Sequence, residues 1–301
     1  MNLQELRYLV ALADHRHFGR AAESCNVSQP TLSSQIKKLE EELGVTLLER
    51  TNKRVDLTPV GGQILAHARA VLDESREIAI LARAARDPLV GPLRLGVIPT
   101  LAPYLMPLIL KPLKLAYPGL TIELWEDQTR VLMEGIRNHR LDAALLASAS
   151  DAPEITEIAL FDEPLLAALP PAHRFAGAKM VSEPALSAEL LVLSDGHCLA
   201  NQALTACGAR RGAARNSLQG AMQAATLETL VNLVAAGYGA TLIPALAADW
   251  FRKSDVVLRP LAARSARTIR LASRPGFARP QALRALEKVI RKAVAGRLRI
   301  T

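Results

Sequence analysis

Hydrophobic positions in the first 58 residues repeat at helical spacing in three short segments. The first segment shows the 3-4-3 spacing of one helix face, at Leu3, Leu6, Val10 and Ala13. A second short helix is expected over residues 18–25. The third begins after Ser28, a typical N-cap residue, and ends at Gly44. Since a short break separates the last two helices, the pattern predicts a helix-turn-helix.

Two apolar segments follow the third helix. Residues 45–48 and 55–57 are strand candidates, and the polar residues 50–54 lie between them. This arrangement predicts a hairpin, which would form a wing beside the helix-turn-helix.

A long amphipathic helix is expected after the hairpin. It begins at the cap pair Thr58-Pro59, runs to about Arg86 and ends at Asp87-Pro88. A heptad seam runs along it through Ile64, Ala68, Val71, Ser75, Ile78, Ala82 and Ala85. Such a seam can pack on the core of its own chain or on a second chain. Its regularity and its place between two domains favour dimerisation.

From Gly91 onward, apolar strands alternate with helices, which indicates an α/β fold. Strands are expected at 93–98, 121–125, 141–146, 164–169, 191–193, 222–224 and 240–243, and helices at 101–116, 131–138, 227–236 and 280–295.

Composition narrows the class of protein. Half of the 301 residues are hydrophobic, yet no run of about eighteen uncharged apolar residues occurs, and charged residues interrupt the first thirty positions. We therefore expect a soluble cytoplasmic protein of two or three domains without membrane contact. The three cysteines are too few for a secreted disulfide framework, so any disulfide here would be transient and chemical.

The formal net charge of +8 invites a nucleic-acid interpretation, but its distribution weakens it. Residues 1–58 carry eight basic and eight acidic residues, whereas residues 251–301 carry 14 basic and 2 acidic ones. The basic side chains of the last helix and its end (Arg284, Lys288, Arg291, Lys292, Arg297, Arg299) are expected to form a solvated face.

The case for DNA binding comes instead from the outward face of the third helix and from the hairpin tip. Short hydroxyl and amide side chains at a helix N-terminus suit base edges and phosphates in a major groove, and wing cations suit adjacent phosphates. An ordinary solvated face is the alternative, which the preceding turn and following wing disfavour. The candidate contacts to double-stranded DNA are Gln29, Pro30, Thr31, Ser33, Ser34, Gln35, Lys37, Lys38, Arg50, Lys53 and Arg54.

These residues resemble the winged helix-turn-helix of LysR-type transcriptional regulators. The matching segments are Leu3-Gln4-Glu5-Leu6-Arg7-Tyr8, Phe18-Gly19-Arg20-Ala21-Ala22, Ser28-Gln29-Pro30-Thr31-Leu32-Ser33, Leu39-Glu40, Gly44, Leu47-Leu48-Glu49-Arg50 and Leu57-Thr58-Pro59. The resemblance continues to the C-terminus. It implies a homodimer formed through the linker helix, assembly into a homotetramer, and RNA polymerase as a partner.

The resemblance also implies the domain organisation. A DNA-binding domain would span residues 1–58 and a linker helix 59–88. A two-lobed α/β regulatory domain, like a periplasmic binding protein, would span 89–301. Its first lobe would comprise about 89–162 and 265–301, and its second about 163–264.

A second group of residues carries possible redox chemistry. Ser194 or Asp195 can N-cap a short helix that leaves Cys198 in its first turn beside His197. Both the helix N-terminus and the histidine favour a thiolate, which can attack the O–O bond of a peroxide and form a sulfenic acid. Cys207 is the nearby candidate for a resolving thiol. The alternative is two inert, semi-buried cysteines.

Geometry would make this chemistry a switch. If the segment were continuous helix, nine steps would separate the two cysteine Cα atoms by about 13 Å, whereas a disulfide needs less than about 7 Å. Disulfide formation would therefore remodel the segment.

The segment 193–199 with Cys207, followed by 226–230 and 235–237, is similar to the peroxide-sensing branch of the LysR-type regulators. The resemblance implies a peroxidatic Cys198, a resolving Cys207, hydrogen peroxide as the signal and a thiol reductant as a partner. It also implies that Thr100, Thr129 and His197 surround the peroxide, with Arg267 as a stabilising cation. Ala200-Asn201 departs from the Arg-Asp often found in the family pattern, which affects redox tuning.

Other chemistries are disfavoured. Cys25 is expected to be a small core residue. A metal site of His197, Cys198 and Cys207 lacks the usual ligand spacing, and no phosphate loop, dinucleotide fingerprint or zincin motif occurs, so we expect no cofactor. Two alternative functions remain: a regulator controlled by a metabolite in the crevice between the lobes, and a thiol peroxidase. The second leaves the winged helix without a purpose, so we expect a regulator and not an enzyme.

Overall fold

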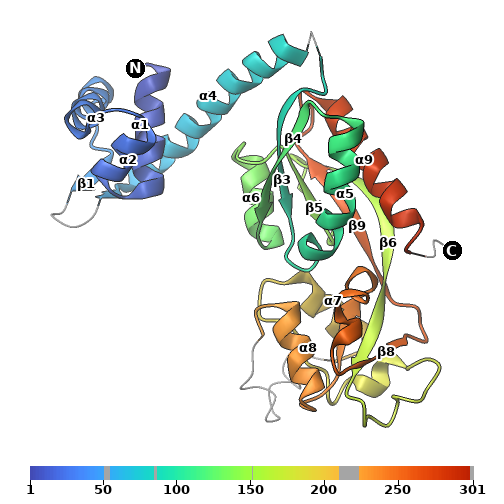
Figure 1. Ribbon diagram of the computed structural model, residues 1–301. Coiled ribbons are helices and arrows are strands. Elements are labelled where there is room, and N and C mark those ends of the chain that lie inside the picture. The colour runs from blue at the N-terminus through green and yellow to red at the C-terminus, as the bar shows by residue number, and fades with distance from the viewer. Residues whose placement is uncertain (51–54, 85–86, 151, 210–223, 299–301) are drawn as a thin grey trace. The chain divides into compact units, whose positions relative to one another are not determined.

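The computed structural model describes residues 1–50, 55–84, 87–150, 152–209 and 224–298 (Figure 1). The chain divides into an N-terminal unit, residues 1–86, and a C-terminal unit that contains nearly all of residues 87–301.

The N-terminal unit contains the predicted helix-turn-helix and hairpin. Its elements are α1 (Leu3–His15), α2 (Phe18–Ser24), α3 (Gln29–Leu43), β1 (Leu48–Arg50), β2 (Val55–Leu57) and α4 (Pro59–Ala84). The predicted ends of α3 are confirmed, because the Ser28 hydroxyl accepts a hydrogen bond from the Thr31 amide and Gly44 has a left-handed φ of 68°. Cys25 is half-buried and packs against the core of this unit, as expected.

The first strand of the hairpin begins later than predicted. The segment 45–48 is expected from its sequence to be a strand, but only Leu48 belongs to β1. The Glu40 carboxylate accepts hydrogen bonds from the amides of Leu47 and Leu48, at 2.8 and 3.2 Å. A side chain of α3 therefore satisfies backbone amides at the start of the hairpin, where strand pairing was expected.

The predicted heptad seam of α4 is largely uncovered. Ala68 is buried in the core of the unit, but Val71 is 44% exposed and Ile78 is 69% exposed. Ala85, the last seam residue, lies outside the described residues. Apolar side chains left exposed at heptad spacing favour a second chain as their partner, so dimerisation through α4 stays a prediction.

In the described residues, the C-terminal unit is built on one sheet of seven strands. They are β3 (Gly91–Val97), β4 (Leu120–Glu126), β5 (Ala143–Leu146), β6 (Thr156–Leu169), β7 (Thr241–Pro244), β8 (Val257–Pro260) and β9 (Ala266–Ser273). Their order is β4-β3-β5-β9-β6-β7, and β8 also pairs with β6. Strand β3 is parallel to β4 and β5, whereas β9 is antiparallel to β5 and β6.

Two hydrophobic cores lie along this sheet. The first packs β3, β4 and β5 against α5 (Ala102–Ala116), α6 (Thr129–Arg137) and α9 (Pro280–Ala295). The second packs β7 and the end of β6 against α7 (Cys198–Ala206) and α8 (Leu227–Ala235). Strand β6 pairs with β9 over its first part and with β7 and β8 over its second, so it joins the two cores (Figure 1). Short 3-10 helices occur at Glu183–Leu186, Ala245–Ala247 and Trp250–Lys253.

Several strand predictions in this unit were wrong. Residues 191–193 form no named strand; isolated bridges join Leu190 to Ala240 and Leu193 to Ala224, and residues 222–223 lie outside the described part of the chain. Strands β8 and β9 were missed, and β6 begins eight residues before its predicted start.

Polar residues inside β6 and β9 hid these strands. Asp162 pairs with Thr268 across the ladder and accepts a hydrogen bond from its hydroxyl at 2.6 Å, and Glu163 pairs with Arg267. Each polar side chain is satisfied by the neighbouring strand, which an alternating hydrophobic pattern cannot reveal.

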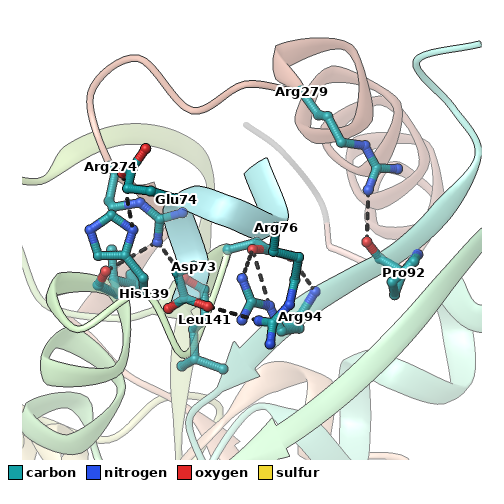
Figure 2. A network of polar contacts seen from close by, with 11 residues as sticks. Asp73, Glu74, Arg76, Pro92, Arg94, His139, Leu141, Arg274 and Arg279 are labelled. Atoms are coloured by element: carbon teal, nitrogen blue, oxygen red, sulfur yellow. Dashed lines mark hydrogen bonds and ion pairs between the residues drawn. The ribbon is translucent and has the colours of Figure 1, made fainter. Parts of the chain in front are cut away.

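Arginines of the basic C-terminal segment support the fold. Figure 2 shows Arg274 donating to the Leu141 carbonyl at 2.8 Å and Arg279 donating to the Pro92 carbonyl at 2.7 Å. Arg291, expected on a solvated face, donates to the carbonyls of Ala159 and Leu160. Several positively charged side chains of this segment therefore hydrogen-bond to backbone carbonyls of the fold. Arg299 lies outside the described residues.

No helix in the described part of the chain has the length and hydrophobicity to cross a membrane.

Candidate functional site

Helix α3 carries the predicted DNA contacts on one side. Leu32, Ile36 and Leu39 are buried. Gln29, Pro30, Thr31, Ser34, Lys37 and Lys38 are exposed, and Ser33 and Gln35 are half-buried. The side chain of Arg50 and all of Lys53 and Arg54, the predicted wing cations, lie outside what the structure describes.

One of the α3 cations is tied to the fold. The Lys38 ammonium lies 3.3 Å from the Glu5 carboxylate, which is almost completely buried. Burial acts to raise the pKa of Glu5, but the Asn2 amide and Lys38 outweigh it, so the pKa lies below its ordinary value. Lys38 is therefore positioned by a negative charge, whereas Lys37 makes an exposed i,i+4 pair with Glu41 at 3.6 Å.

Cys198 is the first residue of α7. His197, with an extended backbone, occupies the N-cap position, so the expectation that Ser194 or Asp195 caps the helix was wrong. The Ser194 amide instead donates to the Ala224 carbonyl at 2.9 Å, which holds this residue beside the second core. Cys198 lies in the first turn of the helix, as predicted.

Gly196 lets the chain turn tightly before α7. Its φ of +95° favours glycine, and a Cβ atom here would lie 2.0 Å from Oε1 of Gln128. The Gln128 amide nitrogen also donates to the Asp195 carbonyl at 3.3 Å. Gln128 follows the end of β4, and its role could not be predicted from the sequence because it contacts a loop 67 residues away.

A small pocket lies beside the first turn of α7. It has room for about one water-sized molecule, roughly 10 Å³. Its lining residues are Ile98, Pro99, Thr100, Gln128, Thr129, Gly196, His197 and Cys198. Thr100, Thr129, His197 and Cys198, which were predicted from the sequence to share a site, thus meet at one pocket.

The polar groups of this pocket differ in their hydrogen bonding. The Thr129 hydroxyl oxygen is buried and makes no hydrogen bond within the described part of the chain. Burial lowers the pKa of His197, so the imidazole is neutral at pH 7. His197 is therefore uncharged there, and the positive charge that was expected to stabilise the thiolate is not available from it.

Arg267 does not line this pocket but lies behind Thr100. Its Nη1 donates to the Thr100 hydroxyl at 2.8 Å and its Nη2 to the Thr100 carbonyl at 3.0 Å. Its charge is paired with Glu163, and neither side chain is exposed to solvent. Arg267 could be identified from the sequence but Glu163 could not, because nothing near Glu163 in the sequence marks its partner.

Cys207 lies at the other end of α7, where it caps the helix. It is 1% exposed within the second core, and burial together with the charge of Glu183 raises its pKa to about 11. Since α7 is continuous from Cys198, the nine-residue rise of about 13 Å applies. The two thiols cannot bond without unwinding this helix.

A larger cavity of about 180 Å³ adjoins the thiol pocket and shares Pro99, Thr100 and His197 with it. Its other lining residues are Pro103, Tyr104, Glu126, Leu193, Ala225, Thr226, Leu227, Glu228 and Trp250. Burial and the charge of Glu228 raise the pKa of Tyr104, and burial raises that of Glu126. The cavity is lined mainly by apolar groups, and the side chains of Glu126 and Glu228 are among its polar lining residues.

Comparisons with known proteins agree with this arrangement. Residues 3–62 match the family of bacterial regulatory helix-turn-helix proteins of the lysR type, and residues 86–295 match the LysR substrate binding domain.

Individual relatives are similar over nearly the whole chain. The DNA-binding transcriptional dual regulator OxyR of Escherichia coli is 44% identical, covering 98% of this chain and 97% of that protein. A probable hydrogen peroxide-inducible genes activator of Mycobacterium avium is 39% identical, covering 96% and 93%.

Solved structures give the same result. A full-length OxyR variant from Pseudomonas aeruginosa matches with a TM-score of 0.78 and 37% identity over 97% of this chain and 98% of that one. A hydrogen-peroxide-bound OxyR mutant from Corynebacterium glutamicum matches with a TM-score of 0.68 and 33% identity, covering 98% and 93%. The chain belongs to the LysR family of DNA-binding transcriptional regulators.

Proposed function

We propose that this regulator responds to hydrogen peroxide and switches by reversible disulfide formation between Cys198 and Cys207. The observation that carries the proposal is the pocket in which the Cys198 thiol meets two threonine hydroxyls and a neutral imidazole. Its size suits a molecule little larger than water. The OxyR relatives, which carry the names of peroxide-inducible activators, support the same function.

The chemistry follows from the two thiols. The Cys198 thiolate attacks one peroxide oxygen, the O–O bond breaks, and the other oxygen takes up a proton and leaves as water. The resulting sulfenic acid is attacked by the Cys207 thiol, which forms the disulfide and releases a second water molecule. A thiol reductant returns two electrons and restores both thiols.

Unwinding of α7 would couple this chemistry to DNA. The helix contributes Leu199, Ala203 and Leu204 to the second core, while Cys198 packs against the first. Bringing the two sulfur atoms together would disrupt both sets of contacts and change the shape of the regulatory domain.

In the assembly that we propose, α3 and the wing bind operator DNA and α4 forms a homodimer. Two dimers form a homotetramer in the cytoplasm, and the altered assembly changes its contact with RNA polymerase. The proposed domain boundaries are 1–58, 59–88 and 89–301. The lobes divide near residues 162 and 265, which lie within β6 and directly before β9.

Footprinting one promoter with reduced and oxidised protein tests this function. Peroxide should produce an intramolecular Cys198–Cys207 crosslink by mass spectrometry and a footprint shift that dithiothreitol reverses. Cys198→Ser should abolish both changes, and Cys25→Ser should abolish neither. A Cys198→Ser protein that still switched would contradict the proposal.

The larger cavity supports a second candidate, control by a small metabolite. Its volume of about 180 Å³ and its two carboxylates suit a neutral or cationic ligand better than an anion. A metabolite that changed operator affinity in a Cys198→Ser, Cys207→Ser protein would favour this function. A protein that responded only to peroxide would exclude it.

A further inference from the structure

A buried ion pair lies directly behind the thiol pocket. Glu163 of β6 and Arg267 of β9 stand opposite each other in the antiparallel ladder, and both side chains are 0% exposed. One carboxylate oxygen of Glu163 accepts from Arg267 Nε at 2.9 Å and lies 2.8 Å from Nη2. The other accepts from the Leu246 amide at 2.9 Å. Both oxygens of Glu163 are therefore occupied, and the orientation of the guanidinium is fixed.

The remaining donors of Arg267 point toward the pocket wall. Nη1 donates to the Thr100 hydroxyl at 2.8 Å, and Nη2 donates to the Thr100 carbonyl at 3.0 Å. Thr100 lines the pocket together with Cys198, whereas Glu163 and Arg267 are not among its lining residues. A chain of contacts thus runs from Glu163 through Arg267 to one hydroxyl of the site.

This chain sets the direction of the Thr100 hydrogen bond. A guanidinium has hydrogen-bond donors and no acceptor, so the Thr100 oxygen must accept from Arg267. Its single hydrogen is then left for another partner. The Thr129 hydroxyl has no partner in the described part of the chain and can donate or accept. The pocket therefore combines one hydroxyl poised to donate with one that is free to do either.

We propose that Glu163 is a positioning residue that, through Arg267, makes Thr100 a hydrogen-bond donor to the departing oxygen of the peroxide. The inference rests on the proposed function. When the Cys198 thiolate attacks, sulfur loses two electrons and forms the S–O bond. The electron pair of the broken O–O bond moves to the far oxygen, which becomes water after taking a proton from solvent. Thr100 stabilises the negative charge that develops on that oxygen.

This assignment changes the role expected of Arg267. Its positive charge is already neutralised by Glu163, so it acts on the peroxide through a neutral hydroxyl rather than as a free cation. In Glu163→Gln, the size and the acceptor for Leu246 can be kept, but the ion pair is lost and an amide group faces the guanidinium donors. The guanidinium would then move away from Thr100.

Sulfenic acid formation on Cys198 can be measured directly. In full-length Cys207→Ser protein, the product is trapped with dimedone, and the second-order rate constant for peroxide is measured. We expect Glu163→Gln and Thr100→Val each to lower this constant by about tenfold to a hundredfold, and Thr100→Ser to retain most of it. Glu163→Gln added to Thr100→Val should cause little further loss, because both changes remove the same donor. Two full, multiplicative losses, or an unchanged rate in Glu163→Gln, would overturn the proposal.

The pH profile separates positioning from a charge effect. If Glu163 acts through Thr100, Glu163→Gln lowers the rate at every pH and leaves the midpoint of the profile in place. If its removal instead exposes the Arg267 charge to the Cys198 thiolate, the midpoint moves to lower pH and the rate rises on the acidic side. That second result would contradict the proposal.

Asp142→Asn provides a matched control. It breaks a second buried ion pair of the same unit, in which Asp142 accepts from Arg94 Nε at 3.2 Å and Nη2 at 2.7 Å, and neither residue lines the pocket. It should lower the melting temperature and leave the oxidation rate unchanged. An equal loss of rate in Asp142→Asn would show a general structural effect and overturn the assignment.

Folding of each reduced variant is checked by thermal unfolding and operator binding. If Glu163→Gln does not fold, Arg267→Lys replaces it as the test. This variant keeps a positive charge beside Glu163 but loses the two hydrogen bonds from the guanidinium to Thr100, so it should lower the oxidation rate to the level of Thr100→Val. A wild-type rate in Arg267→Lys would overturn the proposal. Failure of the parent Cys207→Ser protein to react with peroxide would refute the proposed function itself, so the two failures are distinguishable.

Discussion

Burial gives the two thiols of α7 different reactivity. Cys198 is half-buried at the N-terminus of α7, where it lines the thiol pocket. Cys207 is buried at the other end, and its pKa of about 11 leaves only about one thiolate in ten thousand at pH 7. The first thiol is suited to meet an oxidant, whereas the second becomes reactive only after its surroundings change.

This difference predicts selective alkylation. Iodoacetamide at pH 7–8 should modify Cys198 of the reduced, folded protein at least tenfold faster than Cys207. Peptide mass spectrometry after timed quenching measures both rates, and protein unfolded in guanidinium, where both thiols should react alike, serves as the control. Equal rates in the folded protein would contradict the burial of Cys207.

The buried His197 predicts a pH-dependent stability. Its folded pKa is lowered by desolvation, so the unfolded chain binds a proton more readily below about pH 6.5. Stability should therefore fall as pH drops below that value and level off below the folded pKa. Urea unfolding between pH 5 and 8 measures the slope, and the His197→Gln variant should lose part of it. An identical slope in both proteins would contradict this origin.

Among the elements of the fold, helices were predicted more accurately than strands. The bounds of α9 were predicted correctly and α3 followed its caps, because both signals are local in sequence. Strands β6 and β9 depend on pairs such as Asp162 with Thr268, about a hundred residues apart, and no local pattern contains that information.

The residues of the candidate site also divide into those that local sequence identifies and those that depend on distant contacts. Cys198, Thr100 and Thr129 could be named from their motifs and from the family resemblance. Glu163 and Gln128 could not, because each acts through a contact with a distant element: Arg267 of β9 in one case and the loop before α7 in the other.

The turn before α7 gives a prediction at the scale of an element. Gly196→Ala places a Cβ atom against Gln128 in addition to straining a positive φ. We expect it to lower the Cys198 oxidation rate at least tenfold and to destabilise the protein by more than the roughly 1–2 kcal/mol of backbone strain alone.

Gly208→Ala is the matched control, because Gly208 has a similar positive φ of +62° and nothing within 4 Å of an added Cβ atom. It should show the strain cost and a normal oxidation rate. Stopped-flow oxidation and thermal unfolding compare the two variants. Similar losses of rate would indicate that contact with Gln128 has no role.

At the scale of the whole molecule, the net charge of +8 is a poor guide to DNA binding. In the basic segment 251–301, Arg274, Arg279 and Arg291 donate hydrogen bonds to backbone carbonyls of the fold. Arg297 pairs with Asp249 at 3.4 Å. The predicted DNA-binding domain has no net charge, so the placement of its cations decides binding.

Salt dependence tests this placement. Replacing Lys53 and Arg54 by alanine should weaken operator binding and reduce the slope of log K against log salt by about 0.9 for each phosphate that the protein no longer neutralises. Replacing Arg297 and Arg299 should change neither as much. Fluorescence anisotropy between low and moderate salt gives both slopes, and equal effects from the two pairs would contradict the assignment.

The burial of Cys207 also limits how quickly the proposed disulfide can form. In the proposed mechanism, a sulfenic acid formed on Cys198 would wait for α7 to unwind before it meets Cys207. During that wait one cellular thiol could form a mixed disulfide with Cys198, and a second could reduce it back to the thiol. A brief burst of oxidant would then be erased, while a sustained exposure would be committed to the disulfide. The burial of Cys207 would thus make the protein respond to the duration of an oxidative stress rather than to its highest oxidant concentration.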